Sequence, residues 1–431
     1  MSDDAAPALA RTVWAVLAAA LVWHLLTLLA PPLQPPLRDS AGRDFASYHY
    51  AAKVAAAGGD PYDKARLEEV ARSEGTRRRV HPYFYPPPFV LFVLWSVPLS
   101  LPVAFGVWEV FNELFLIAAG LALWRWWRPL SPWVGAVVVG VGALSYGVSY
   151  GAELGQANAF VLALILAGLW QEERRPGLAG ALVGVAAMAK MSPALIVLWW
   201  ILRRRWTAVA ASIGCAVALS VLVLPWVSAG HQLGFYTGVL PRLGGGDYNG
   251  LTIQIGMFGN HSVPNVLHQL FPSGHNALSG AARAGSAVAT FSVLGALGWL
   301  FFRPTSDPVR LAAQASTVLV AMLLVPVYTF EHHLLLALPA MILSVVGVER
   351  GLLSRRWVIP LGLALAVLAF PLPYLKQLSV RVLDGAPSVV LLGVQEAKFV
   401  ALCTLGAAVA SLGLSRVRER GRMQRLFLDD P

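Results

Sequence analysis

Asp44 is the first side chain that could do chemistry, because it lies where one apolar segment has ended and an amphipathic one begins. It belongs to the polar stretch 43–48, Arg-Asp-Phe-Ala-Ser-Tyr. A carboxylate at the end of a membrane span can lie at the water boundary and still reach into a cleft between spans. A helix cap or first-turn residue is the ordinary alternative for such an aspartate. Asp44 is therefore a candidate catalytic carboxylate.

Lys190 is the second candidate, because it interrupts an apolar stretch that runs from Leu178 to Leu202. A lysine at a span end can simply extend its ammonium group to the membrane interface. Here Pro193 breaks the helix shortly after the lysine, and a lysine at a broken helix is well placed to hold an anionic phosphate as a point charge. We predict a phosphate-binding role for Lys190.

A histidine pair, His332 and His333, opens another apolar segment and follows Glu331. Adjacent histidines point to different sides of a helix, so at most one of them faces a cleft while the other packs or caps. The pair favours phosphate or sugar binding. It favours a metal site less, because the sequence shows no third ligand that would define a coordination geometry.

Amide and acidic side chains supply further candidates. Gln156 and Asn158 open a span soon after Glu153, where capping of the helix start is the alternative use of an asparagine. Paired amides near tyrosines also suit ligands rich in hydroxyl groups. Asn260 and His261 lie in a long loop, and long structured loops in compact domains usually have a function.

The composition decides the class of protein that must position these groups. Of the 431 residues, 57% are hydrophobic and 13% are charged, whereas soluble domains carry about 25% charged residues. The sequence therefore predicts an all-α polytopic membrane protein. The net charge of +10 collects in short clusters between apolar runs, as topology signals do, which argues against nucleic-acid binding. Cys215 and Cys403 fall inside apolar runs and imply no disulfide.

The apolar runs predict the spans. Thr12 to Ala30 is long enough to be a retained first span. The loop 38–85 that follows contains two predicted surface helices, Asp44–Ala57 and Lys64–Ser73. The later runs are 86–101, 103–124, 133–150, 157–171, 176–190, 192–202, 207–227, 282–302, 308–327, 332–348, 357–372 and 388–414.

Basic clusters set the expected topology, because cytoplasmic loops hold the excess of Lys and Arg. All six basic clusters are cytoplasmic together only if run 86–101 is re-entrant or partly inserted, which gives about twelve spans and a cytoplasmic basic tail at 415–431. The clusters lie at 125–128, 174–175, 203–205, 303–310, 350–356 and 416–425. The chain is then one membrane domain, 1–431. The Asp44 loop, Glu153 to Asn158, Lys190, the long loop 228–276 and residues 331–333 all fall on the extracytoplasmic face.

These features resemble the GT-C membrane glycosyltransferases, and most specifically glycosyltransferase family 87, the polyprenyl-phosphate-mannose-dependent mannosyltransferases. The resemblance covers nearly the whole chain and depends on the order of several short motifs. The motifs are Asp44-Phe45 with Tyr48, Gly59-Asp60-Pro61-Tyr62, Tyr85-Pro86-Pro87, Gly155-Gln156-Ala157-Asn158, Lys190 before a proline, Asn260-His261-Ser262 and His332-His333. Two departures are the Met191-Ser192 insertion before Pro193 and a histidine at position 261 where the family suggests glutamine.

The resemblance implies a GT-C fold and inverting transfer of a sugar, with mannose as the first candidate, from a polyprenyl-monophosphate donor to a lipid-linked or glycan acceptor. Asp44 would be the catalytic base, and Lys190 with His332 or His333 would bind the donor phosphate. No metal or other cofactor is expected. Localisation would be the bacterial inner membrane, among its lipids, with the active site extracytoplasmic. The implied sugar or acceptor contacts are Tyr48, Tyr85, Glu153, Gln156, Asn158, Asn260, His261 and Glu331.

Two alternatives stay open at the level of sequence. A polyprenyl-phosphate-arabinose transferase, or a transferase of another polyprenyl-phosphate sugar, would share nearly every feature described. A secondary transporter of a polar or lipid-linked solute would share the spans, but it should show repeat symmetry and charges deep within spans rather than clustered at one face.

Overall fold

Helices dominate the computed structural model, which describes residue 22 and residues 41–127, 146–274, 277–301, 305, 307–383 and 387–414. The only strands in these ranges form one two-stranded hairpin. The predicted first span apart from residue 22, most of the run 133–150 and the basic tail 415–431 lie outside the described residues. The described part shows the all-α architecture that the composition predicts.

Several helices are long and apolar enough to cross a membrane. Four qualify alone, namely α4 (Leu101–Trp127), α14 (Gly280–Phe301), the continuous pair η6 (Glu331–Ala337) and α16 (Leu338–Glu349), and α20 (Ala397–Leu414). Two bent pairs raise the number to six, namely α6 (Tyr146–Leu154) with α7 (Asn158–Gln171), and η7 (Arg355–Trp357) and α17 (Val358–Ala369) with α18 (Leu372–Gln377) and η8 (Leu378–Val382). Shorter apolar helices are α8 (Pro176–Ala189), α10 (Trp206–Leu222) and α15 (Pro308–Leu324). The chain is an all-α polytopic membrane protein, and the count of about twelve spans stays a prediction.

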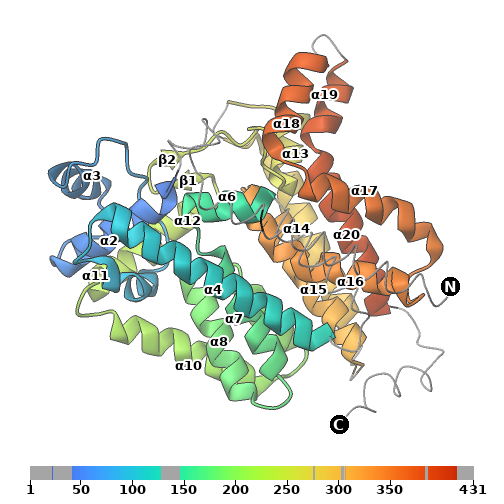
Figure 1. Ribbon diagram of the computed structural model, residues 1–431, viewed down its shortest axis with the longest axis horizontal. Helices are drawn as coiled ribbons and strands as arrows, with labels where there is room; N and C mark the ends of the chain where they lie inside the picture. Colours follow the sequence, from blue (N-terminus) through green and yellow to red (C-terminus); the bar gives the residue numbers. More distant parts are fainter. Residues whose placement is uncertain are drawn as a thin grey trace.

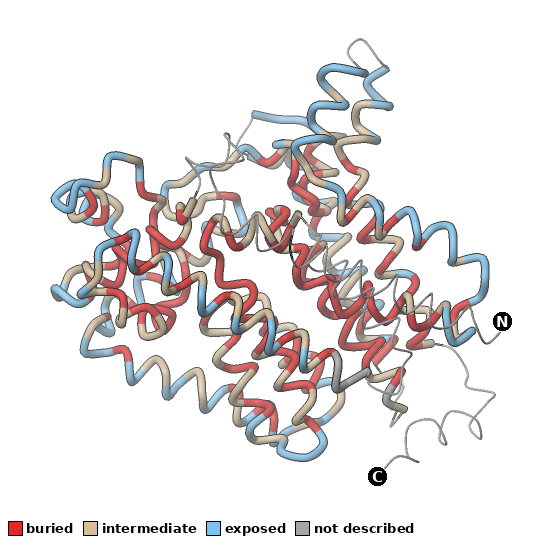
Figure 2. Tube along the Cα trace, in the orientation of Figure 1, coloured by how far each residue is buried: buried red, intermediate tan, exposed pale blue. Residues whose placement is uncertain are grey.

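The membrane helices form two groups that α6 joins (Figure 1). In one group α8 packs against α7 and α10, and α4 packs on α7; in the other α15, α16 and α17 pack on α20. Helix α6 contacts η6 and so links the groups. The outward sides of α10 and α17 are exposed (Figure 2). On these helices Ile213, Val217, Ile359 and Leu363 are each more than half exposed. Apolar exposure of this extent suits contact with lipid tails.

The first loop contains α2 (Arg43–Ala56) and α3 (Lys64–Ser73), close to the predicted bounds. The expectation that both lie on the surface is wrong for α2, because ten of its residues are buried. Alanines along α2 let α4 and the short helices η3 (Pro87–Phe92) and η4 (Leu94–Ser96) pack against it. The run 86–101 forms only these 3₁₀ turns before α4, since successive prolines lack the N–H groups an α-helix needs.

The long loop 228–276 is well structured as far as residue 274. It contains α11 (Ala229–Gly234), η5 (Phe235–Val239), α12 (Leu240–Leu243), the strands β1 (Asp247–Tyr248) and β2 (Leu251–Thr252), and α13 (Val263–Leu270). The remaining helices are α9 (Ala194–Leu202) and α19 (Ser388–Gln395). At the hairpin tip the Asn249 side-chain amide donates to the carbonyls of Tyr62 (2.7 Å) and Tyr83 (3.0 Å). The two predicted extracytoplasmic loops therefore contact each other.

Candidate active site

Asp44 is the second residue of α2, at the end of the helix that faces α6. Its Oδ1 lies 3.3 Å from Nδ1 of His81, and its Oδ2 accepts a hydrogen bond from Nε2 of Gln156. The side chain keeps 16% of its surface exposed. Gly42 is the N-cap of α2, its N–H donates to the Glu153 carbonyl (2.7 Å), and no side chain caps the helix. Asp44 is therefore held by side chains at a partly open position and does not act as the helix cap.

The state of the Asp44 carboxyl follows from its neighbours. Burial raises the pKa of Asp44, but the hydrogen bond with His81 and the charges of His332, His81 and Arg43 outweigh burial and hold the pKa below its usual value. The carboxylate is thus ionised at neutral pH and has a lone pair that can accept a proton.

Gln156 connects Asp44 to two buried tyrosines. Its Oε1 accepts from the hydroxyl of Tyr85 (3.4 Å) and lies 3.5 Å from that of Tyr48, whose single proton is donated to Tyr85 (2.7 Å). Burial, with the nearby Asp44 charge, raises the pKa of both tyrosines, so both hydroxyls stay protonated donors. This arrangement turns the amide NH₂ of Gln156 toward Asp44. The two tyrosines were predicted as sugar contacts; in the structure both lie against Gln156, and the contact with a sugar stays a prediction.

A sharp break between α6 and α7 brings the candidate groups together. The helix axis bends by 117° between α6 and α7, and Gly155 in the break has φ +71°. A Cβ at Gly155 would lie 2.6 Å from Cβ of Phe45, so a larger residue would push α2 away. Because the chain turns here, Gln156 reaches Asp44, while Asn158 starts α7 on the other side of the break.

Lys190 lies at the junction of α8 and α9, as the sequence predicts. Its Nζ donates to Oδ1 of Asn158 (2.7 Å), and Nδ2 of Asn158 donates to the backbone carbonyl of His332 (2.8 Å). Asp44 acts electrostatically on Lys190, and Asp44 and Lys190 both act on His332. Four sequence-predicted residues, Asp44, Asn158, Lys190 and His332, thus lie at one site.

The two histidines have different roles. Nδ1 of His333 accepts the backbone N–H of Phe330 (3.0 Å) and so caps η6. The His332 side chain is buried beside Tyr150, and among the described residues its Nδ1 has no hydrogen-bond partner. His332 is also the histidine of the pair that interacts electrostatically with Asp44.

Glu331, His261 and Asn260 form a separate buried network rather than lining the Asp44 site. Glu331 Oε1 lies 2.6 Å from Nε2 of His261, and its Oε2 accepts from Nζ of Lys398 (2.6 Å). Asn260 donates to the carbonyls of Ile255 and Val327 and accepts from the N–H of Thr329. The polar atoms of Glu331 and Asn260 are thereby engaged by protein groups, and their role as sugar or acceptor contacts stays a prediction.

Two residues of these networks were missed by sequence reasoning. His81 carried a weak signal, namely its place in the same loop as Asp44. Lys398 carried a stronger one, because it interrupts the apolar run 388–414 in the same way that Lys190 interrupts its own run.

The contact between His81 and Asp44 predicts a pH effect. If Asp44 is the base, transfer requires its ionised form, and the acidic limb of the wild-type pH–rate profile should lie below about pH 5. Replacing His81 by Ala removes a contact that lowers the Asp44 pKa, while burial still raises it, so the acidic limb of the pH–rate profile should move to higher pH. His81→Gln keeps a donor and should restore part of the shift. Superimposable profiles for wild type and His81→Ala would contradict this coupling.

Comparison with known proteins places these groups in a family. A family model described as glycosyltransferase family 87 matches residues 83–326, more than half of the chain. The chain therefore belongs to glycosyltransferase family 87, which is consistent with the GT-C architecture and makes it a membrane glycosyltransferase rather than a transporter. The matched range includes Gln156, Asn158 and Lys190, but it begins after Asp44 and ends before His332. No curated protein matches the chain.

Proposed function

We propose that this glycosyltransferase moves a sugar, with mannose as the first candidate, from a polyprenyl-monophosphate donor to a hydroxyl of a lipid-linked or glycan acceptor. The observation that carries the proposal is the placement of an ionised Asp44 on one side of the α6–α7 break and Lys190 with His332 on the other. A base and a cation on either side of one turn are what a displacement at an anomeric carbon needs.

The proposed step is a single displacement with inversion. Asp44 accepts the proton of the acceptor hydroxyl while that oxygen forms a bond to the anomeric carbon of the donor. The bond from the anomeric carbon to the phosphate oxygen breaks, and its electron pair leaves with the lipid phosphate. Lys190 balances the charge that develops on the phosphate, and His332 supplies a ring nitrogen beside it. Gln156 holds the carboxylate in place through Tyr48 and Tyr85.

The proposal includes no metal, because a monophosphate leaving group can be balanced by cationic side chains. Among the described residues no group of three or more His, Cys, Asp or Glu side chains could hold a metal ion. Addition of a divalent chelator to the assay is the direct measurement, and it should leave the transfer rate unchanged.

An assay of the purified enzyme with defined polyprenyl-phosphate sugars tests the donor. Donors carrying mannose, arabinose or glucose are supplied with candidate acceptors, and products are read by mass. A mannosylated product that forms in wild type and not in Asp44→Asn would support the proposal. A pentose product instead would assign the arabinose alternative. Transfer from a nucleotide sugar but from no lipid-linked donor would contradict the proposed donor class.

The topology is part of the proposal. We expect Lys190, Asn158 and the loop 228–276 to be extracytoplasmic, with residues 203–205 and the tail cytoplasmic. Cys215 and Cys403 are first replaced, and single cysteines are then introduced. A cysteine at loop position 249 should react with an impermeant reagent in intact cells. A cysteine at position 418 should react only after the cells are opened. Labelling at position 418 in intact cells would overturn the orientation.

A further inference from the structure

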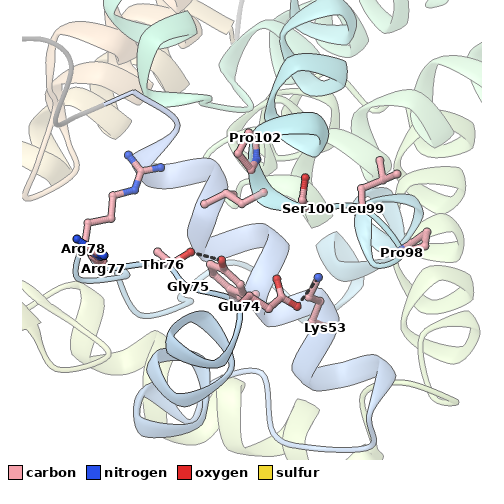
Figure 3. Close-up of a pocket in the computed structure, with 12 residues that line it drawn as sticks. Lys53, Glu74, Gly75, Thr76, Arg77, Arg78, Pro98, Leu99, Ser100 and Pro102 are labelled. Carbon is pink, nitrogen blue, oxygen red and sulfur yellow. Dashed lines mark hydrogen bonds and ion pairs between the residues drawn. The ribbon is translucent and has the colours of Figure 1, made fainter.

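A cavity whose lining does not include Asp44 lies beside α2. It has a volume of about 640 Å³, within the range of small-molecule sites. Its walls come from α2 (Tyr50 and Lys53), the segment Glu74–Arg78 after α3, and the segment Pro98–Pro102 that enters α4 (Figure 3). Its lining shares no residue with the groups that surround Asp44.

The lining of this cavity carries excess positive charge. Lys53 and Glu74 neutralise each other in an ion pair of 2.5 Å, which leaves Arg77 and Arg78. Arg78 uses its Nη1 to donate to the Ala41 carbonyl, and a guanidinium has five N–H donors, so others remain. Arg77 is exposed and has no acidic partner within the described part of the chain. Two arginines at one wall favour a ligand with a phosphate group.

The position of the cavity indicates where that phosphate comes from. Leu101 and Pro102 both line the cavity and begin α4, one of the helices that can cross a membrane. From this end an apolar stripe runs along one face of α4 through Val103, Val110 and Leu114, each more than half exposed. Headgroups lie at the ends of spans and acyl chains lie along them.

We propose that this cavity binds the phosphate-bearing headgroup of an anionic membrane lipid, whose acyl chains lie against the apolar stripe of α4. The positively charged wall recognises the phosphate, and the stripe distinguishes a lipid from free phosphate. The site is independent of the donor and acceptor roles proposed above.

Lipid binding to the purified full chain tests the site. Native mass spectrometry of the protein in detergent, titrated with phosphatidylglycerol or phosphatidylcholine, gives the affinity for each lipid. Wild type should prefer phosphatidylglycerol. Arg77→Gln should weaken phosphatidylglycerol binding about fivefold, the effect of one basic side chain near an anionic membrane surface. Arg79→Gln is the matched control, because Arg79 pairs with Glu68 at 3.9 Å and does not line the cavity.

A second variant tests the opposite wall. Ser100→Asp adds a negative charge at the start of α4, and aspartate is as good a helix cap as serine, so α4 should form normally. It should also lower phosphatidylglycerol binding. Equal binding of the two lipids, or equal losses in Arg77→Gln and Arg79→Gln, would overturn the proposal. So would inorganic phosphate that displaces the lipid at the same concentration as the lipid itself. These experiments measure lipid binding and not sugar transfer, so their outcome does not depend on which sugar donor the enzyme uses.

Discussion

Asp44→Asn should give a folded, membrane-inserted enzyme whose transfer rate is about a hundredfold to ten-thousandfold below wild type, the usual contribution of a general base. Asparagine keeps the size of the side chain and can still bond Gln156 after an amide flip, but it cannot accept the proton of the acceptor hydroxyl. The measurement is product formation at saturating donor and acceptor, together with donor binding. Donor binding should persist in the variant. A wild-type transfer rate in purified Asp44→Asn would reject the assignment.

The alternative role of Asp44 as a helix cap predicts a different result. Asparagine caps helices as well as aspartate, so a capping Asp44 would tolerate the change. The structure already weighs against this alternative, since Gly42 occupies the N-cap position and both Asp44 oxygens face side chains from other segments. The transfer rate of the variant therefore separates the two roles: a capping Asp44 predicts wild-type stability and wild-type transfer, whereas a catalytic Asp44 predicts wild-type stability and a much lower rate.

Two other acids serve as controls for the base. Both oxygens of Glu331 are bound within the buried network, so Glu331→Gln should lower the thermal stability without moving the pH–rate profile. Glu153 holds α2 through its backbone carbonyl, which Glu153→Gln leaves in place. Loss of transfer in a stably folded Glu331→Gln, with normal transfer in Asp44→Asn, would move the base to Glu331.

The sequence predicts those site residues that interrupt a run of apolar residues. Lys190 stands out because a charge inside an apolar run is costly, and Pro193 marks the helix junction that the structure confirms. The Gly155–Asn158 stretch likewise marks a break between two apolar helices, and the structure places a 117° turn there. Helix breaks of this kind can be predicted because proline and glycine restrict or permit backbone conformations regardless of what packs around them.

Pairing between distant segments could not be read from the sequence. The polar residues of α2 predicted that the helix lies on the surface. In the structure, residues much later in the sequence cover it: Tyr85 and Gln156, which contact Tyr48, follow it by 37 and 108 residues. Asn260, His261 and Glu331 were predicted as ligand contacts because they are polar residues near span ends. Their buried network is completed by Lys398, which lies 67 residues after Glu331 in the sequence. The Asn249-Gly250 pair did carry a local hairpin signal. What that hairpin touches depends on the tertiary fold.

The second large effect is expected at Lys190. Lys190→Met keeps most of the side-chain length but removes the charge that we propose faces the donor phosphate, so transition-state stabilisation of about 2 to 4 kcal/mol should be lost. This corresponds to a rate roughly thirtyfold to a thousandfold lower. Lys190→Arg keeps the charge and should recover part of the rate. Single-turnover kinetics with the lipid-linked donor measure the effect on chemistry apart from product release.

The histidine pair provides the matched test of the same phosphate site. His332→Ala removes the ring whose Nδ1 has no hydrogen-bond partner in the described part of the chain, so it should slow transfer while the protein stays folded. His333→Ala instead removes the acceptor for the Phe330 N–H, so its main effect should be a lower unfolding temperature. If donor phosphate is bound as proposed, Lys190→Met and His332→Ala should also be non-additive when combined, because they act on one group. Unchanged turnover in Lys190→Met, His332→Ala and His333→Ala alike would place the donor phosphate elsewhere in the fold.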